Sequence, residues 1–341
     1  MVGAGAVGQY LAARLRLAGD EVVLLARASA LEILNARGVT LRIGAQEWPV
    51  GIHAADDPLD PLLAEPFELV IVAVKAYATD EAAHSIAAIA ACKDSTILTV
   101  QNGVGNEEAL GAIFGLSRII AGALTVPVER LDETTVGAPL RGGLSIAPVG
   151  GNANNWLLAV FERTGLTVRA ASDWRAMKWS KLLINLVANA VCAVLDMTPR
   201  EVYANSIAFP VERQCLREAV AAMDAARLTA IPLVGFPAPQ FAWAIRTLPA
   251  SLLHLLMARR ASSARGDKLP SLLIDARAGR QQTEIRWLNG AVADRAATAG
   301  LAAPANAAVT RVLTGFANGS IDRSSYRGRP EKLAAEIAAA K

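Results

Sequence analysis

A glycine-rich stretch at the start of the chain has the spacing of a phosphate-binding turn. It matches the pattern G-x-G-x-x-G and consists of Gly3, Ala4, Gly5, Ala6, Val7 and Gly8. In this pattern the first glycine makes a strand-to-helix turn, the second lets the backbone approach a pyrophosphate, and the third lets the helix pack closely on the sheet. The helix N-terminus adds N–H groups and a positive dipole end. A helical pattern over 6–18 and a strand pattern over 21–26 follow, so we expect a dinucleotide-binding turn.

Arg27 stands at the end of the second strand, where a dinucleotide-binding domain usually has Asp or Glu. An acidic residue there binds the 2′-hydroxyl of NAD, whereas an arginine pairs with the 2′-phosphate of NADP. A solvated surface arginine is the alternative interpretation. Its position favours the first interpretation, and we expect NADP(H) as the cofactor.

Two further polar residues follow predicted strands. Lys75 comes directly after the apolar run 69–74, and Asn102 follows the run 95–100. The carboxyl ends of parallel strands form the ligand-binding edge of such a sheet. Each could be an ordinary turn residue, but two of them at successive strand ends favour a shared cleft, in which Asn102 would orient a nicotinamide or a substrate carbonyl.

A predicted helix carries Lys181, Asn185 and Asn189 at i, i+4 and i+8, on one face among apolar neighbours. Buried asparagines cost free energy unless they are hydrogen-bonded. The stripe therefore either makes structural hydrogen bonds or faces a cleft, and we favour the cleft. Glu284 begins another helical segment, where the helix dipole alone would favour a carboxylate, and Ser271 opens a further one.

The elements that position these residues change character along the chain. Up to about residue 170, short β-rich runs alternate with helical patterns, which predicts βαβ units and an α/β Rossmann-type domain. Within it, 38–52 is predicted to form a hairpin with Gly44-Ala45 at its turn, and 119–149 to add strands to the sheet edge. Over 171–330 the patterns are helical and predict an all-α domain. Its first helix should run from a cap at Ser172-Asp173 to about Leu195.

Further helical stretches are expected from Pro199 and over 208–229, 239–262, 270–297 and 304–317, with a polar loop at 260–270. The first strand is expected to be short, because only Met1 and Val2 precede Gly3 and a strand usually has about five residues. We expect the natural chain to begin upstream, which the intact mass of the native protein would test.

The composition limits the remaining function classes. The chain has 341 residues and a net charge of only +3, with both signs interspersed, so nucleic acid is not an expected partner. The longest apolar run, Leu182 to Leu195, is shorter than a bilayer span and contains two asparagines, so no membrane is expected. Three separated cysteines argue against disulfides and metal sites and favour a reducing, cytoplasmic compartment. The alanine-rich helices suit a homodimer and a monomer equally.

The ordered set of motifs resembles the ketopantoate reductases, from the first residue to about 317. The matching pieces are GAGAVG, VKAY, QNGVG, KLLIN with the second asparagine, Ser271, and TEI followed by NG. The resemblance implies reduction of the 2-keto acid 2-dehydropantoate to pantoate with NADPH, in the pathway to pantothenate and coenzyme A.

The resemblance also implies a role for each matching position. Lys181 matches the catalytic lysine. In that role an ammonium stabilises the negative charge that develops on the carbonyl oxygen and supplies the proton. Glu284 matches the acidic residue near the cofactor and active site. The matching substrate-binding positions are Asn102, Asn185, Asn189 and Ser271. The matching cofactor-binding positions are Gly3 to Gly8, Arg27, Lys75, Asn102 and Val128.

Two positions depart from the family's pattern. Pro199 and Lys268 stand where further substrate-binding asparagines are expected, so a reductase of another 2-keto acid stays open. The motifs are also compatible with a 3-hydroxyacid dehydrogenase and with a non-catalytic NADP-binding protein. Arg27 and the QNGVG motif disfavour the dehydrogenase, and the presence of both Lys181 and Glu284 disfavours the non-catalytic protein. No histidine lies in any of these motifs, which disfavours enzymes with a histidine acid/base.

Overall fold

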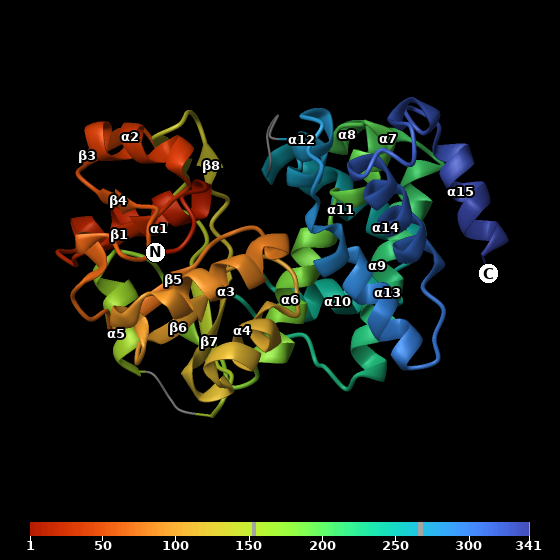
Figure 1. The fold of residues 1–341 in the computed structure, drawn as a ribbon. Coiled ribbons are helices and arrows are strands. Elements are labelled where there is room, and N and C mark those ends of the chain that lie inside the picture. Colours follow the sequence, from red (N-terminus) through yellow and green to blue (C-terminus); the bar gives the residue numbers. More distant parts are fainter. Residues whose placement is uncertain (152–154, 265–268, 341) are drawn as a thin grey trace. The chain divides into compact units, whose positions relative to one another are not determined.

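The computed structural model describes residues 1–151, 155–264 and 269–340. The chain divides into two compact units. The first consists of Met1–Gln101, Gly105–Lys178 and Pro232–Phe236, and the second of Asn102–Val104, Trp179–Ile231 and Pro237–Lys341. The first unit is an α/β sheet domain and the second is helical, which confirms the predicted fold class (Figure 1).

The strands belong to the first unit. They are β1 (Val23–Leu25), β2 (Val39–Ile43), β3 (Gln46–Val50), β4 (His53–Ala55), β5 (Leu69–Val72), β6 (Thr96–Thr99), β7 (Ile119–Leu124), β8 (Glu129–Arg130), β9 (Thr135–Ala138), β10 (Leu144–Pro148) and β11 (Val168–Ala170). The main sheet contains the parallel pair β4–β1 and the series β5–β6–β7–β10–β11, in which only β10 and β7 pair antiparallel.

Val2 joins these two parts of the main sheet. It forms parallel bridges to Leu25 on one side and to Val72 on the other. The Val2 N–H donates to Ile71 O at 2.8 Å, and the Leu25 N–H donates to Met1 O at 2.7 Å. Residues 1–3 therefore occupy the central position expected for a first strand, and the glycine turn follows directly from it.

Helices cover both faces of the main sheet (Figure 1). In β6, Leu98 belongs to a core cluster with Tyr10 and Phe161, whereas its neighbour Ile97 belongs to a cluster with Ile86 and Leu110. Side chains alternate between the faces of a strand. Helices α1 and α5 thus pack on one face, and α3 and α4 on the other. The helices of this unit are α1 (Ala6–Leu17), α2 (Ala28–Arg37), α3 (Thr79–Ala88), α4 (Asn106–Phe114) and α5 (Asn155–Arg163), with short 3-10 turns η1 (Pro61–Leu63), η2 (Ala76–Ala78), η3 (Ala90–Cys92) and η4 (Leu116–Arg118).

The predicted hairpin over 38–52 is confirmed, but the prediction that 119–149 adds strands to the sheet edge is only partly right. β2 and β3 pair antiparallel with Ile43 opposite Gln46, so Gly44 and Ala45 form the turn. Only β7 and β10 of the 119–149 region extend the main sheet. β8 and β9 instead join the hairpin in a second sheet of order β3–β2–β9–β8. The reason is a long-range parallel pairing of β2 with β9, which local patterns do not reveal.

The helical unit is built from the remaining elements. They are the later part of α6 (Trp174–Leu186), then α7 (Ala190–Leu195), α8 (Pro199–Ala204), α9 (Ala208–Ala225), α10 (Ala238–Thr247), α11 (Ala250–Ala264), α12 (Ser271–Arg277), η5 (Glu284–Trp287), α13 (Asn289–Thr298), α14 (Pro304–Ala317), η6 (Arg323–Ser325) and α15 (Pro330–Ala339). Two of these predicted helices are wrong in extent, and one helix was not predicted. The stretch 239–262 breaks at Leu248-Pro249, because proline cannot continue the helical hydrogen bonds. The stretch 270–297 splits into α12, η5 and α13, and α15 lies beyond the helices that the sequence predicts.

The expected long helix to Leu195 is also wrong, because it ends at Leu186 and restarts at Ala190. Asp173 does cap its start, since its carboxylate accepts the Ala176 N–H at 3.0 Å. At the break, Ala188 takes a left-handed φ of 47°, and its N–H donates to Glu212 Oε1 at 2.5 Å. A carboxylate from α9 thus replaces a helical acceptor.

By length and composition alone, Trp174–Leu195 is apolar enough to cross a membrane. However, 78% of its apolar window is buried inside the protein, and the break at 187–189 interrupts it. These properties are typical of core helices. The expected polar loop 260–270 is partly wrong, because α11 extends to Ala264.

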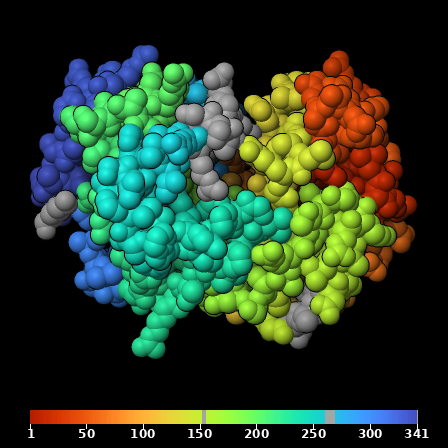
Figure 2. Space-filling model, turned by 180° about the vertical axis from the view of Figure 1, so that it is seen from behind, coloured from red at the N-terminus to blue at the C-terminus, as the bar shows by residue number. Residues whose placement is uncertain are grey.

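One short segment belongs to the sheet unit although helices of the other unit precede and follow it in the chain. In Pro232–Phe236, the Val234 carbonyl accepts the Thr125 hydroxyl at 2.6 Å, and the Val234 N–H donates to Ser145 Oγ at 3.5 Å. Helices α10 and α11, which follow this segment, lie at the surface in the teal and cyan part of Figure 2, where Trp243, Leu252 and Leu256 are exposed.

Candidate active site

The glycine turn has the geometry that its sequence predicts. Gly3 has a φ of 102°, and a Cβ placed on it would lie 2.8 Å from Val74 Cγ1. A Cβ on Gly8 would lie 1.8 Å from Gly3 O. Gly5, by contrast, caps α1, and a Cβ on it would meet no atom of the described residues within 4 Å. The backbone is thus packed tightly at the first and third glycines and open at the second.

Three further predicted residues of the sheet unit follow parallel strands. Arg27 is exposed after β1 and caps α2, and Lys75 is half-buried after β5 and caps η2. Val128 is half-buried after β7. Because β1, β5 and β7 run in the same direction, these residues and the glycine turn lie at the same edge of the sheet.

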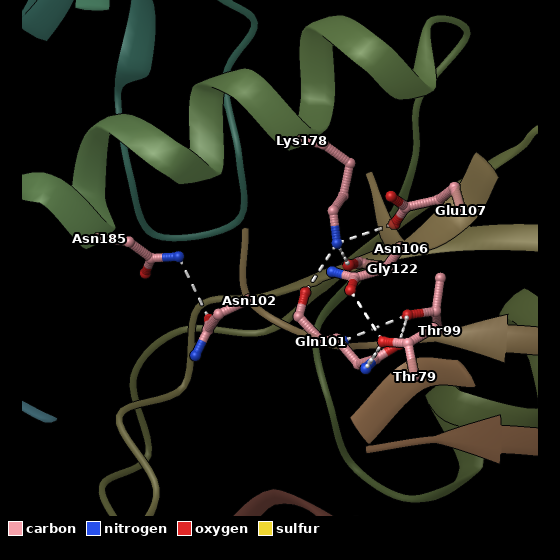
Figure 3. Close-up of polar contacts among 9 residues, drawn as sticks. All are labelled: Thr79, Thr99, Gln101, Asn102, Asn106, Glu107, Gly122, Lys178 and Asn185. Carbon is pink, nitrogen blue, oxygen red and sulfur yellow. Dashed lines mark hydrogen bonds and ion pairs between the residues drawn. The ribbon is translucent and has the colours of Figure 1, made fainter. Parts of the chain in front are cut away.

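The end of β6 is held by a buried polar network (Figure 3). The Gln101 side chain donates to Thr79 Oγ1 at 2.9 Å and accepts the Thr99 hydroxyl at 3.0 Å. Thr79 in turn donates to Ala76 O at 2.7 Å, and its Oγ1 lies 3.0 Å from Asn106 Oδ1. The network connects the end of β6 to the segment after β5.

Lys178 is a buried charged residue next to this network that the sequence analysis did not single out. Its side chain is 1% exposed, and its ammonium has three acceptors: Gln101 O at 2.7 Å, Glu107 Oε1 at 2.9 Å and Gly122 O at 3.4 Å (Figure 3). An ammonium has three N–H donors, so every one of them has an acceptor. One signal was available, because Trp174 and Leu182, four residues away on either side, place Lys178 on the apolar face of α6.

In the helical unit, a chain of amide hydrogen bonds links the predicted substrate residues. Asn185 donates to Asn102 Oδ1 at 3.2 Å (Figure 3), and Asn189 donates to Asn185 O at 2.9 Å. Asn189 Oδ1 accepts the Leu272 N–H at 3.1 Å and so caps α12, which begins at the exposed Ser271. Lys181 is half-buried one turn before Asn185 on α6.

Glu284 lies close in the fold to the loop that carries Asn102, through the 3-10 turn η5. It is 3% exposed at the start of η5, and Trp287 ends that turn. The Trp287 carbonyl accepts the Val104 N–H at 3.1 Å, and a Cβ on Gly103 would lie 2.5 Å from the same carbonyl oxygen. The helical unit therefore brings Asn102, Asn185, Asn189, the start of α12 and the element carrying Glu284 together.

One carboxylate next to the buried network has a shifted pKa. Burial raises the pKa of Glu108, and the neighbouring Glu107 carboxylate raises it further, while Arg175 and Lys178 act in the opposite direction. Glu107 itself is fully buried in the first turn of α4, so Lys178 is the cation that compensates its charge.

Both parts of the chain match models of one protein family. A family model described as "Ketopantoate reductase PanE/ApbA" matches residues 1–150, and "Ketopantoate reductase PanE/ApbA C terminal" matches 173–317. The chain belongs to the ketopantoate reductase family. The resemblance inferred from the motifs is thereby confirmed.

Individual members of the ketopantoate reductase family match nearly the whole chain. The 2-dehydropantoate 2-reductase of Archaeoglobus fulgidus is 24% identical over 322 residues, which cover 94% of this chain and 97% of that protein. The crystal structure of a PanE/ApbA family ketopantoate reductase from Ralstonia eutropha superposes with a TM-score of 0.77 at 26% identity, over 94% of this chain and 99% of that one.

The same fold also occurs in a structure of D-mandelate dehydrogenase with NADH and anilino(oxo)acetate. Its TM-score is 0.77 at 18% identity, over 93% of this chain and 98% of that one. Against the family's pattern, Pro199 is buried at the first position of α8, where Thr198 and Glu201 form a capping box. Lys268 lies outside the described residues.

Proposed function

We propose that the chain reduces 2-dehydropantoate to pantoate with NADPH, and that Lys181 is the general acid. The observation that carries this proposal is the row of hydrogen-bonded amides from Asn102 through Asn185 and Asn189 to the start of α12, in which Asn185 lies on α6, the helix that carries Lys181. Amide groups in a row suit a substrate with a carboxylate, a carbonyl and a hydroxyl. Relatives over almost the whole length carry the name of this activity.

The residues of the sheet unit fit a dinucleotide. Open space over Gly5 and the N–H groups of the first turn of α1 suit a pyrophosphate. Arg27 would pair with the 2′-phosphate of NADP(H), and Lys75 and Val128 would add further cofactor contacts. Asn102, which belongs to the helical unit, is a further proposed cofactor-binding residue. The bound reduced nicotinamide supplies the hydride.

The protein's own residues stabilise the charge that develops on the substrate. Lys181 would place its ammonium at the carbonyl oxygen, neutralise the developing negative charge and deliver the proton. Asn185, Asn189 and Ser271 would hold the substrate's hydroxyl and carboxylate. Glu284, whose carboxylate is buried, is the second catalytic group and would balance the positive charge of the lysine.

NADPH oxidation by the purified protein with 2-dehydropantoate, beside a panel of other 2-keto acids, tests the proposal. We expect the highest kcat/KM with 2-dehydropantoate and NADPH. A clearly better substrate in the panel would support the second candidate, a reductase of another 2-keto acid, which the buried Pro199 at an expected asparagine position favours. Absence of turnover with every keto acid would contradict both and leave a non-catalytic NADP-binding protein.

A further inference from the structure

Two lysines lie one turn apart on α6, and their surroundings differ. Lys178 is buried with three acceptors around its ammonium, whereas Lys181 is half-buried. The three acceptors of Lys178 come from the end of β6, from α4 and from β7. One ammonium thus ties helix α6 to three other elements of the sheet unit.

The Lys178–Glu107 pair contributes little to stability by itself. Both side chains are at most 1% exposed, and desolvation of two charges offsets most of their attraction. Among the described residues, Glu107 Oε2 has no hydrogen-bond partner, so the carboxylate is only half satisfied. A buried pair of this kind needs a reason other than stability, and specifying one local geometry is such a reason.

The geometry that the pair specifies is that of the Gln101–Asn102 peptide. Lys178 donates to the Gln101 carbonyl at 2.7 Å, and that carbonyl shares a rigid plane with the Asn102 N–H. After Asn102, the Val104 N–H donates to Trp287 O at 3.1 Å and holds the loop on that side. Before Asn102, Thr79 and Thr99 hold the Gln101 side chain, and the Lys178 bond to the Gln101 carbonyl is the contact that fixes the peptide plane itself.

We propose that Lys178 and Glu107 are positioning residues that hold Asn102 in its active orientation through the Gln101 carbonyl. Lys178 acts on the backbone, Glu107 fixes the ammonium of Lys178, and Asn102 presents its amide to the ligand. The proposal rests on the proposed function, because it assigns the effect to Asn102 as a ligand-binding residue.

The test compares Lys178→Met with the neutral pair Lys178→Met/Glu107→Gln, each with and without Asn102→Ala. The single variant leaves Glu107 buried without a counter-ion and should lower the melting temperature. The double variant removes both charges and should restore it. Its kcat should nevertheless fall about 10- to 100-fold, because misplaced groups slow catalysis without loss of the fold. In the Asn102→Ala background the same double change should lower kcat less than about twofold, because coupled residues are not additive.

The chain offers a matched control on the same two helices. Arg175 and Glu108 form an ion pair of 3.7 Å with side chains 52% and 49% exposed. The variant Arg175→Met/Glu108→Gln should therefore leave kcat unchanged. A purely structural role for Lys178–Glu107 predicts a loss of melting temperature that the neutral pair does not restore, or equal losses of kcat in both backgrounds. Either of these results would overturn the proposal. So would an unchanged kcat in the double variant Lys178→Met/Glu107→Gln, or a wild-type kcat in Asn102→Ala.

Failure of the proposed function is distinguishable from failure of this inference. If the wild-type protein turns over no keto acid, the function fails, and the same set of variants is then compared by the dissociation constant of NADPH. The double variant should weaken NADPH binding in the presence of Asn102 and not in its absence. Equal NADPH affinities for the wild type and the double variant would then overturn the inference.

Discussion

The glycine turn at residues 3–8 and the loop that begins at Gln101 are held in their conformations in opposite ways. The close backbone packing of the turn requires the absence of side chains, since a single methyl group on Gly8 would lie 1.8 Å from the carbonyl oxygen of Gly3. The start of the loop, in contrast, is held by side chains, since Gln101 forms hydrogen bonds with Thr79 and Thr99. Added side-chain atoms should therefore disturb the packing of the glycine turn, and removal of polar atoms should disturb the conformation of the loop.

The largest expected effect separates chemistry from cofactor binding. Lys181→Ala should lower kcat about 10²- to 10⁴-fold, because it removes the general acid. The KM for NADPH should stay within about threefold, because the glycine turn is untouched. Steady-state kinetics with the best keto acid measures both. An equal loss of kcat and NADPH affinity would contradict the division of labour between the two regions.

Within the glycine turn, two matched variants should behave differently. Gly8→Ala should lower the free energy of unfolding by about 1–3 kcal/mol, since its methyl group meets the backbone at Gly3. Gly5→Ala has room for its methyl and should keep its stability, but it should weaken NADPH binding roughly 10- to 100-fold by filling space for the phosphates. Denaturant unfolding and NADPH titration test the pair. Equal stability of the two variants would show that the packing at Gly8 is not critical.

Arg27 is the side chain on which the glycine-turn region should depend for its choice of cofactor. Arg27→Asp should reduce the preference for NADPH over NADH by about 10- to 100-fold, because a charge-assisted bond is replaced by repulsion. The ratio of kcat/KM for the two cofactors measures it, with Arg37→Asp at the far end of α2 as the control. An unchanged ratio would remove Arg27 from the cofactor site.

The last prediction concerns one hydroxyl in the loop region, which should affect stability and not the choice of cofactor. Thr79→Val leaves the Gln101 amide buried without its acceptor and should cost about 1–3 kcal/mol of unfolding free energy. Thr247→Val removes an exposed hydroxyl that donates to Trp243 O at 2.8 Å and should cost less than about 0.5 kcal/mol. Comparable costs would mean that the loop does not depend on its buried network.

Local patterns predicted the parts of the molecule that local physics determines. The close contact of Gly8 with Gly3, the β2–β3 hairpin and the cap at Asp173 all depend on residues within a few positions of one another. The placement of Lys75 after β5 follows from the apolar run that precedes it, whereas Val128 was expected only from the family resemblance.

Long-range partners explain what local patterns missed. The break after Leu186 needs Glu212, and the anchor of the loop joins Lys178 to Glu107, which lies on a different helix far away in the sequence. Asn189 was predicted from helical spacing, yet its role as the cap of α12 depends on Leu272. Sequence periodicity placed Lys181 and Asn185 one turn apart on α6, but Asn189 lies beyond the end of that helix at Leu186, and spacing alone did not predict the hydrogen bonds of either asparagine.

The segment Pro232–Phe236 has a consequence for how such proteins exchange parts during evolution. The sheet unit includes this segment far from the rest of its sequence, with Val234 bonded to Thr125 and Ser145. A single recombination event near residue 178 would therefore transfer the helices together with a foreign piece of the sheet unit. Substrate ranges in this architecture should diversify through point substitutions on the helices more readily than through shuffling of whole units.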